Sequence, residues 1–251
     1  MTPELVNYDQ RPELWERLFE VFAGILPEYN LHGDVLDTGY WERLHQIFGR
    51  YQLVLVGPDE EILATARGMP TSWDGTAAGL GPGLDAAINA GFAVHDAGRE
   101  PNTLCALGIE VAPSHQGVGL GTVMLQALRA IAREAGFGQV IIPARPAWKD
   151  RYPLVAIERY AHWTTDGGLP FDPWLRTQVR AGGELSVPTS RSSLITGAVA
   201  DWESWTGMRF PDGDDYVIPG GLATVRIDRD ADLGTYWEPS VWVVHESGVS
   251  R

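Results

Sequence analysis

Residues 115–121 read HQGVGLG, and the chain continues as TVMLQALRAIAREAG to residue 136. The continuation repeats apolar residues at the spacing of an amphipathic helix, so Gly117, Gly119 and Gly121 stand at its start. A glycine inside a helix costs roughly 0.5–1 kcal/mol relative to alanine, so three glycines in this position need a reason. The first N–H groups of a helix are unpaired and lie at the positive end of its dipole. Glycines let a phosphate approach these groups closely, so the stretch predicts an anion-binding turn.

Three other interpretations of the glycines compete with this one. A P-loop ends in Gly-Lys-Ser/Thr, whereas Gly121 is followed by Thr122 with no lysine. A dinucleotide-binding fingerprint has the spacing G-x-G-x-x-G and an acidic residue on a following strand, and the sequence shows neither. The third interpretation is a helix start in which glycines serve only tight packing, and the sequence leaves this alternative open.

The predicted elements around the turn form a unit of strand, turn, helix and strand. Residues 104–111 (LCALGIEV) and 139–145 (QVIIPAR) are apolar runs typical of buried strands. Such a unit favours parallel or mixed pairing with helices covering the sheet. Upstream, the sequence predicts helices at 11–26 and 38–49, then an antiparallel hairpin of strands 51–57 and 61–69.

The rest of the chain is elaborated around this unit. Residues 71–103 form a Gly- and Ala-rich insertion with one predicted helix, GLDAAINAGFAVHDAG, and we interpret it as a functional lid, with a structural excursion as the alternative. Further elements are predicted as helices within 151–163 after Pro153, at 171–183 and at 199–208, a strand-like stretch at 184–197, and strands at 221–230 and 236–246. Because no repeat or linker interrupts the chain, residues 1–251 are predicted to form one domain with an enlarged C-terminal half from 146 to 251.

Composition excludes several classes of function. The formal net charge of −14 argues against binding to nucleic acid or to an anionic membrane, because both need a cationic surface. The single cysteine, Cys105, permits no disulfide within the chain. The N-terminus lacks the features of a signal peptide, and no apolar run approaches the ~18 residues of a membrane span. A soluble, cytoplasmic protein is therefore expected.

The stretch from Gln116 to Gly121 matches the Q/R-x-x-G-x-G/A motif of the GCN5-related N-acetyltransferase (GNAT) superfamily, which the chain resembles over about residues 11–145. The resemblance implies an α+β fold with a central mixed sheet flanked by helices. It also implies that the turn holds the pyrophosphate of an acyl-coenzyme A. The residues implied in that contact are Gln116, Gly117, Val118, Gly119, Leu120, Gly121 and Thr122. Backbone groups of Ile109 and Val111 would pair with the pantetheine arm where the strand splays from 139–145.

The catalytic candidates are taken from the residues present, because the sequence does not show the Asn and the Tyr before Gly-Phe that usually follow in the family. A phenol can return a proton to a leaving thiolate, so Tyr160 is the first candidate for the general acid and Tyr152 the second. Glu110 is the candidate general base, because burial raises the pKa of a carboxylate. The alternatives are ordinary packed tyrosines, a solvated strand-end carboxylate, and catalysis by positioning alone.

A basic segment follows the second strand of the unit. Residues 129–191 carry nine Lys or Arg and six Asp or Glu, and Arg145, Lys149 and Arg151 come directly after the strand. These three predict a site for the 3′-phosphate of coenzyme A, for an acidic substrate or for an acyl carrier protein, with surface ion pairs as the alternative. Most of the tryptophans are expected in the core, and three are candidates for lining an acceptor pocket: Trp148, Trp163 and Trp174.

The resemblance, together with these residues, implies an N-acyltransferase that moves an acyl group from acyl-CoA to the amine of a small molecule, without a metal. Two alternatives stay open. One is an acyltransferase that takes its acyl group from phosphopantetheine on an acyl carrier protein, and the other is a non-catalytic acyl-CoA-binding module. The sequence leaves the oligomeric state open, with a homodimer as one alternative.

Overall fold

The computed structural model describes residues 3–36 and 39–248. Within these ranges nine strands form one sheet, in the order β1-β2-β3-β4-β5-β9-β8-β7, and β6 also pairs with β9. The strands are β1 (Glu4–Asn7), β2 (Gln52–Val56), β3 (Ile62–Thr71), β4 (Thr103–Val111), β5 (Gln139–Ala144), β6 (Glu184–Gly197), β7 (Asp215–Val217), β8 (Thr224–Asp228) and β9 (Leu233–Glu246). The α-helices are α1 (Trp15–Val21), α2 (Tyr40–Phe48), α3 (Leu84–Asp96), α4 (Leu120–Glu134), α5 (Ile157–Tyr160), α6 (Pro173–Arg180) and α7 (Val199–Thr206).

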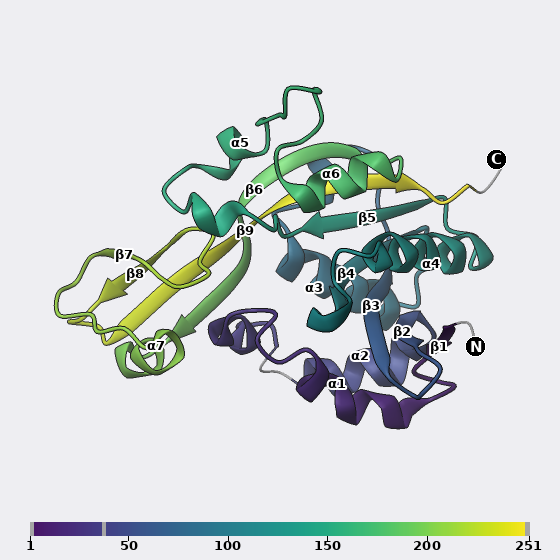
Figure 1. Ribbon diagram of the computed structural model, residues 1–251, viewed down its shortest axis with the longest axis horizontal. Helices are drawn as coiled ribbons and strands as arrows, with labels where there is room; N and C mark the ends of the chain where they lie inside the picture. The colour runs from purple at the N-terminus through teal and green to yellow at the C-terminus, as the bar shows by residue number, and fades with distance from the viewer. Residues whose placement is uncertain (1–2, 37–38, 249–251) are drawn as a thin grey trace.

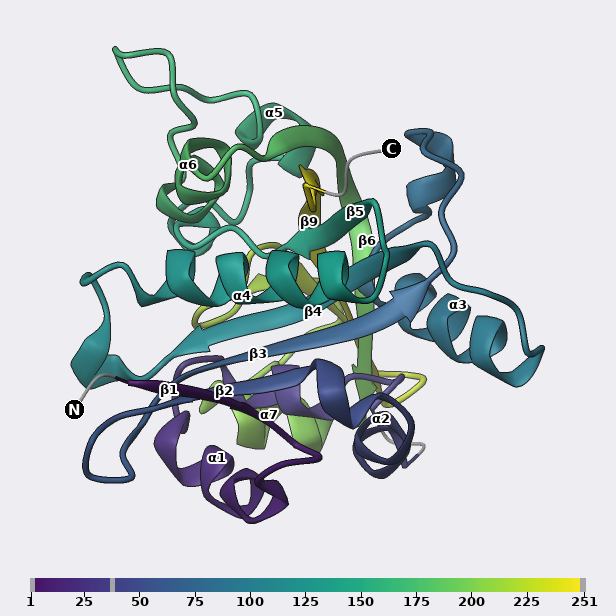
Figure 2. The same ribbon diagram turned by 90° about the vertical axis from the view of Figure 1, so that its right-hand side faces the viewer.

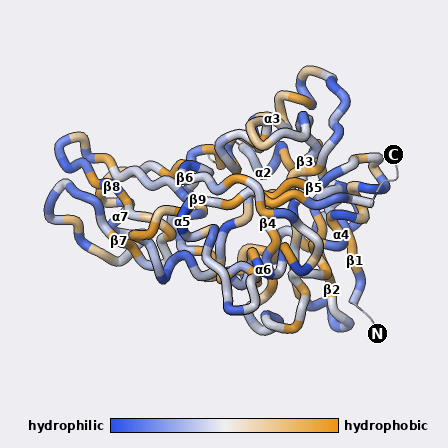
Figure 3. Tube along the Cα trace, turned by 90° about the horizontal axis from the view of Figure 1, so that it is seen from above, coloured by the Kyte–Doolittle hydropathy of each residue, from blue (hydrophilic) through white to orange (hydrophobic). Residues whose placement is uncertain are grey.

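The sheet is mixed and covered by helices on both faces, so the predicted fold class is confirmed. The β4–β5 pair is parallel, and the other pairs in the described ranges are antiparallel. Helix α4 lies on one face, and α1 and α2 lie on the other (Figures 1 and 2). Apolar residues concentrate along β3, β4 and β5 at the centre (Figure 3), because these strands are buried between the two helical layers.

The two parallel strands diverge toward their C-terminal ends. Their ladder joins Thr103 with Gln139 and ends at Cys105 with Ile141, although both strands continue beyond it. Beta-strand β5 is instead paired along its whole length with β9. The sheet is therefore open between the end of β4 and the end of β5, directly before α4 begins.

The C-terminal half is built on a long antiparallel pair of strands, β6 and β9. The segment between them carries α7, β7 and β8, which form the projecting end of the molecule (Figure 1). Its core includes Trp202 and Tyr236 and also takes in Tyr29 from the N-terminal half. Whether the chain behaves as one domain stays a prediction.

The insertion at 71–103 is fastened to the C-terminal half. Its helix α3 contributes Ile88 and Phe92 to the main core. The N–H of Leu84 donates to Ser192 Oγ at 2.9 Å, and Asp85 accepts a hydrogen bond from Ser193 Oγ at 2.6 Å. The insertion is thus part of the packed structure, and its function as a lid stays a prediction.

Some expected boundaries are wrong. The helix expected after Pro153, within 151–163, is reduced to α5, because Ala156 has extended backbone (φ −57°, ψ 140°) and the helix begins only after it. The first helix ends at Val21 instead of residue 26, ahead of Gly24 with φ +76°. Strands β1 and β7 were not predicted, since each is too short to show an alternating pattern.

Candidate functional site

The glycine turn leaves open space in front of α4. Gly117 and Gly119 have φ of +80° and +92°, a region that favours glycine. A Cβ built on either residue would meet no atom within 4 Å, so packing does not account for these two glycines. A Cβ on Gly121 would lie 3.1 Å from Cζ3 of Trp174, so packing does account for the third. The packing interpretation therefore holds for one glycine of the three.

The turn also presents a row of unpaired donors. The backbone N–H groups of residues 117–121 donate to no acceptor among the described residues, and pairing resumes with Thr122 N–H to Gly119 O at 3.0 Å. Helix α4 has 15 residues and no acidic side chain in its first turn, so nothing there neutralises the positive end of its dipole. This arrangement can bind a phosphate or pyrophosphate.

The edge of β4 leads directly to this turn. Ala112 N–H donates to Leu63 O at 2.9 Å, toward β3. Since alternate residues of an antiparallel strand pair with opposite neighbours, Ile109 and Val111 direct their backbone groups toward the opened side. There Val111 O accepts a hydrogen bond from Gln116 Nε2 at 3.3 Å. An extended ligand arm could pair with this edge while its anionic end rests on the turn.

A partly buried ion pair lies beside the open edge, between Glu110 on β4 and Arg67 on β3. Burial raises the pKa of Glu110, and the positive charge of Arg67 opposes that rise. The guanidinium donates to Oε1 of Glu110, whereas Oε2 is buried with no hydrogen-bond partner in the described structure. The sequence analysis did not identify Arg67 as a site residue. It is the only charged residue in the β3 sequence ILATARGMPT, and a charged side chain in such an apolar strand needs an oppositely charged partner.

The tyrosine candidates differ in what their hydroxyl groups contact. Tyr160 is 1% exposed and donates to Asp172 Oδ2 at 2.9 Å. Burial, reinforced by the charge of Asp172, raises the pKa of Tyr160. The hydroxyl of Tyr152 makes no hydrogen bond to a described residue, so its proton is not engaged within the described structure. The role of either phenol stays a prediction.

Asp172 and the rings of Trp163 and Phe171 hold Tyr160 in place. Asp172 also accepts hydrogen bonds from Trp174 N–H and Leu175 N–H and so caps α6. Two of the three tryptophans proposed for an acceptor pocket, Trp148 and Trp163, pack against Phe171 in a cluster of rings with centroids 5.7–5.8 Å apart. Trp174 instead lies against Gly121.

The three basic residues after β5 do not form one exposed cluster. Lys149 is 1% exposed, and its ammonium donates to the carbonyls of Tyr152 at 2.8 Å and Leu222 at 2.5 Å. These two carbonyls engage the ammonium inside the fold, and a contact of Lys149 with a phosphate stays a prediction. Arg145 forms an ion pair with Glu238 and donates to Gly220 O at 3.0 Å. Arg151 stays exposed, with its guanidinium 4.4 Å from the ring centre of Trp148.

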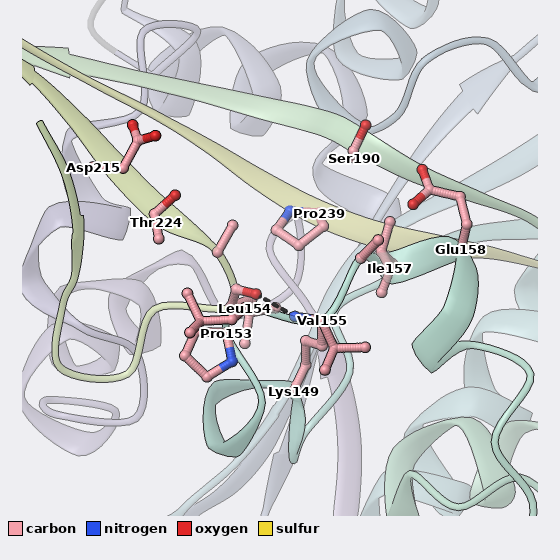
Figure 4. Close-up of a pocket in the computed structure, with 13 residues that line it drawn as sticks. Lys149, Pro153, Leu154, Val155, Ile157, Glu158, Ser190, Asp215, Thr224 and Pro239 are labelled. Carbon is pink, nitrogen blue, oxygen red and sulfur yellow. Dashed lines mark hydrogen bonds between the residues drawn. The ribbon is translucent and has the colours of Figure 1, made fainter.

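Two cavities lie away from the turn. One, of about 440 Å³, is lined by Lys149, residues 153–158 and residues of β8 and β9 (Figure 4). The other, of about 570 Å³, lies between α3 and β6 and includes Asp34 and Asp85. Both carboxylates already accept hydrogen bonds from β6, so we assign them to fixing α3 and the 34–36 segment. No group of three or more His, Cys, Asp or Glu in the described part of the chain is placed to hold a metal ion, and no described helix is long and apolar enough to cross a membrane.

A mixed sheet that opens beside an unpaired helix start is the arrangement expected of the GNAT fold. The sequence model of the acetyltransferase (GNAT) family matches residues 15–149, and the chain belongs to this family. It is 31% identical to the arginine N-acetyltransferase avaD of Aspergillus versicolor over 265 residues, which cover 94% of this chain and 91% of that protein.

Solved structures agree with this fold. The loading GNATL domain of CurA from Lyngbya majuscula superposes with a TM-score of 0.58 at 13% identity, covering 98% of each chain. The GphF GNAT-like decarboxylase, solved in complex with isobutyryl-CoA, has a TM-score of 0.56 at 18% identity, covering 97% of this chain and 99% of that one. At these identities the likeness establishes the fold alone.

Proposed function

We propose that this acyltransferase moves an acetyl or other short acyl group from acyl-coenzyme A to a primary amine of a small cationic acceptor such as arginine. The observation that carries the donor assignment is the row of unpaired N–H groups at 117–121, next to the open edge of β4. The acceptor class is supported by the name of the relative that matches nearly the whole chain.

The chemistry proposed for the site follows from its groups. The pyrophosphate rests on the turn, and the pantetheine arm pairs with the edge at Ile109 and Val111, which brings the thioester into the opening between β4 and β5. Glu110 takes a proton from the acceptor ammonium, directly or through a water. The free amine attacks the carbonyl carbon, which a backbone N–H near 109–111 polarises. The C–S bond then breaks, the nitrogen loses its second proton to solvent to give the neutral amide, and the thiolate receives a proton from a phenol or from solvent.

The test is release of free thiol from acetyl-CoA with a panel of amines. The panel contains arginine, arginine lacking its α-carboxylate, lysine, a neutral arylalkylamine and no amine, and mass spectrometry identifies the product. Amine-dependent release that is strongest for the cationic acceptors supports the proposal. Tight binding of acetyl-CoA without release for any amine contradicts it in favour of a binding module.

The donor is tested separately with acetyl groups on coenzyme A and on a phosphopantetheinyl carrier protein. Comparable or better kcat/KM with the coenzyme A ester supports the proposal. Turnover with the carrier-bound thioester alone would transfer the assignment to a carrier-dependent enzyme.

A further inference from the structure

We infer that Arg67 is a positioning residue for the reaction proposed above, holding Glu110 ionised and turning its free oxygen toward the acceptor amine. The inference rests on the proposed function, in which Glu110 accepts the amine proton. Arg67 lies on β3, the strand paired with β4, and takes no part in the steps proposed above.

The local backbone is shaped to seat this ion pair. The β3–β4 register shifts between Arg67 and Gly68, so that Arg67 is opposite Gly108 while Gly68 is opposite Ala106. Leu107 is therefore the extra residue of a β-bulge, a feature that redirects side chains next to active sites. A Cβ on Gly108 would lie 2.8 Å from Glu110 Oε1 and 3.0 Å from Arg67 Nη2. The glycine thus leaves the space in which the two charged groups meet.

Helix α2 fixes the guanidinium from the other side. The Arg67 guanidinium carbon lies 5.0 Å from the ring centre of Trp41, within the range of a cation–π contact. The side chains of Arg67 and Glu110 are 21% and 12% exposed, so water screens their attraction weakly. With Oε1 engaged by Arg67, Oε2 is left without a partner in the described structure. A buried unpaired carboxylate oxygen is costly unless a ligand donates to it.

Few other ionisable groups act on this pair. Tyr40 and His45 lie on α2, and Cys105 lies on β4. Burial raises the pKa of Tyr40 and of Cys105 and lowers that of His45 to about 4. At neutral pH these three groups are uncharged, so Arg67 is the charge that opposes protonation of Glu110.

The test compares Arg67→Met with Arg67→Lys, which keeps the charge and loses the planar fork. Removing the positive charge raises the pKa of Glu110, so the acidic limb of the kcat/KM profile should move to higher pH by about one unit or more in Arg67→Met. In Arg67→Lys most of this shift should be reversed. The KM values of both substrates should change less than about threefold, because the interaction acts on the base and not on binding.

Two further variants separate positioning from general damage. Gly108→Ala should displace the pair and reproduce part of the shift, since the added Cβ occupies its space. Arg43→Met is the matched control, because Arg43 also pairs with a carboxylate, Asp96, and stacks on an aromatic ring, Phe92, but lies outside the site. It should leave the pH profile unchanged.

Several outcomes would overturn the inference. If Arg67→Met lowers the melting temperature but leaves the acidic limb of the kcat/KM profile at the wild-type pH, Arg67 serves only the stability of the fold. A raised KM for arginine but not for its decarboxylated amine, with the limb unmoved, would make it a ligand of the acceptor carboxylate. Full activity of Glu110→Gln would instead contradict the base in the proposed function. If no amine is acylated at all, a ¹³C NMR titration of Glu110 still decides whether Arg67→Met raises its pKa.

Discussion

Two regions predicted as functional differ in whether their polar groups have hydrogen-bond partners within the described structure. In the glycine turn and β4, five N–H groups and one oxygen of Glu110 have no partner among the described residues. Beyond β5, the charged or polar groups of Arg145, Lys149 and Tyr160 all contact other parts of the fold. Folding tends to satisfy its own polar groups, so unpaired groups that border an opening of the sheet, as these do, are places where a ligand can complete the hydrogen bonding.

The largest effect is expected at the unpaired carboxylate. Glu110→Gln keeps the size and a hydrogen-bonding oxygen but cannot accept the proton, so kcat should fall by about 10²–10³-fold. Burial raises the pKa of Glu110, so the wild-type activity should be lost as pH falls through a value above that of an ordinary glutamate. Steady-state kinetics from pH 5 to 9 measure both effects, with exposed Glu134→Gln as the control. A loss below about threefold would leave catalysis to positioning alone.

The next effect lies in the paired region and concerns stability. Lys149→Met removes the donor from two carbonyls, Tyr152 O and Leu222 O, so the free energy of unfolding should fall by about 2–4 kcal/mol. The KM for acetyl-CoA should stay within about twofold, since the two carbonyls engage the ammonium inside the fold. Chemical denaturation measures the first quantity, with exposed Arg151→Met as control. A raised donor KM at unchanged stability would contradict this interpretation.

The pH dependence of that stability has a definite sign. Burial lowers the pKa of Lys149 to about 8, below the ~10.4 of an unfolded lysine. Between these values the unfolded chain binds more protons than the native chain, so this residue makes stability rise with pH. The difference in unfolding free energy between wild type and Lys149→Met should therefore widen from pH 8 to pH 10. A difference that stays constant over this range would show that Lys149 is not desolvated.

The contrast also explains what the sequence could predict. The hairpin β2–β3, strands β4 and β5, and helix α4 have local periodicity, and the glycine turn has local backbone chemistry, so all are readable from neighbouring residues. The partners of Lys149 and Arg145 are 73 and 93 residues away along the chain, at Leu222 and Glu238. No pattern among neighbouring residues predicts contacts between residues so far apart in the sequence. Arg67 could be predicted in part. As the one charged residue in an apolar strand it indicates an ion pair within the fold, but the sequence does not indicate that the partner is Glu110.

A smaller effect is expected at the open turn itself. Val118 is 71% exposed, so Val118→Glu should leave the fold intact while placing a negative charge beside the bound pyrophosphate. The KM for acetyl-CoA should rise about tenfold at low salt and less at high salt, because exposed charges are screened. Val118→Gln, of nearly the same size, is the matched neutral control. Equal donor KM values for the two variants at low salt would place the pyrophosphate elsewhere.

The smallest effect is expected from a single hydroxyl in the paired region. Tyr160→Phe removes the hydrogen bond to Asp172, so the free energy of unfolding should fall by about 1 kcal/mol while kcat stays within about threefold. Tyr152→Phe is the matched variant, since its hydroxyl has no partner among the described residues and its loss should leave stability unchanged. If a phenol protonates the leaving thiolate, the larger loss in kcat should then belong to Tyr152→Phe. A tenfold or greater fall in kcat for Tyr160→Phe at unchanged stability would instead assign the general acid to Tyr160.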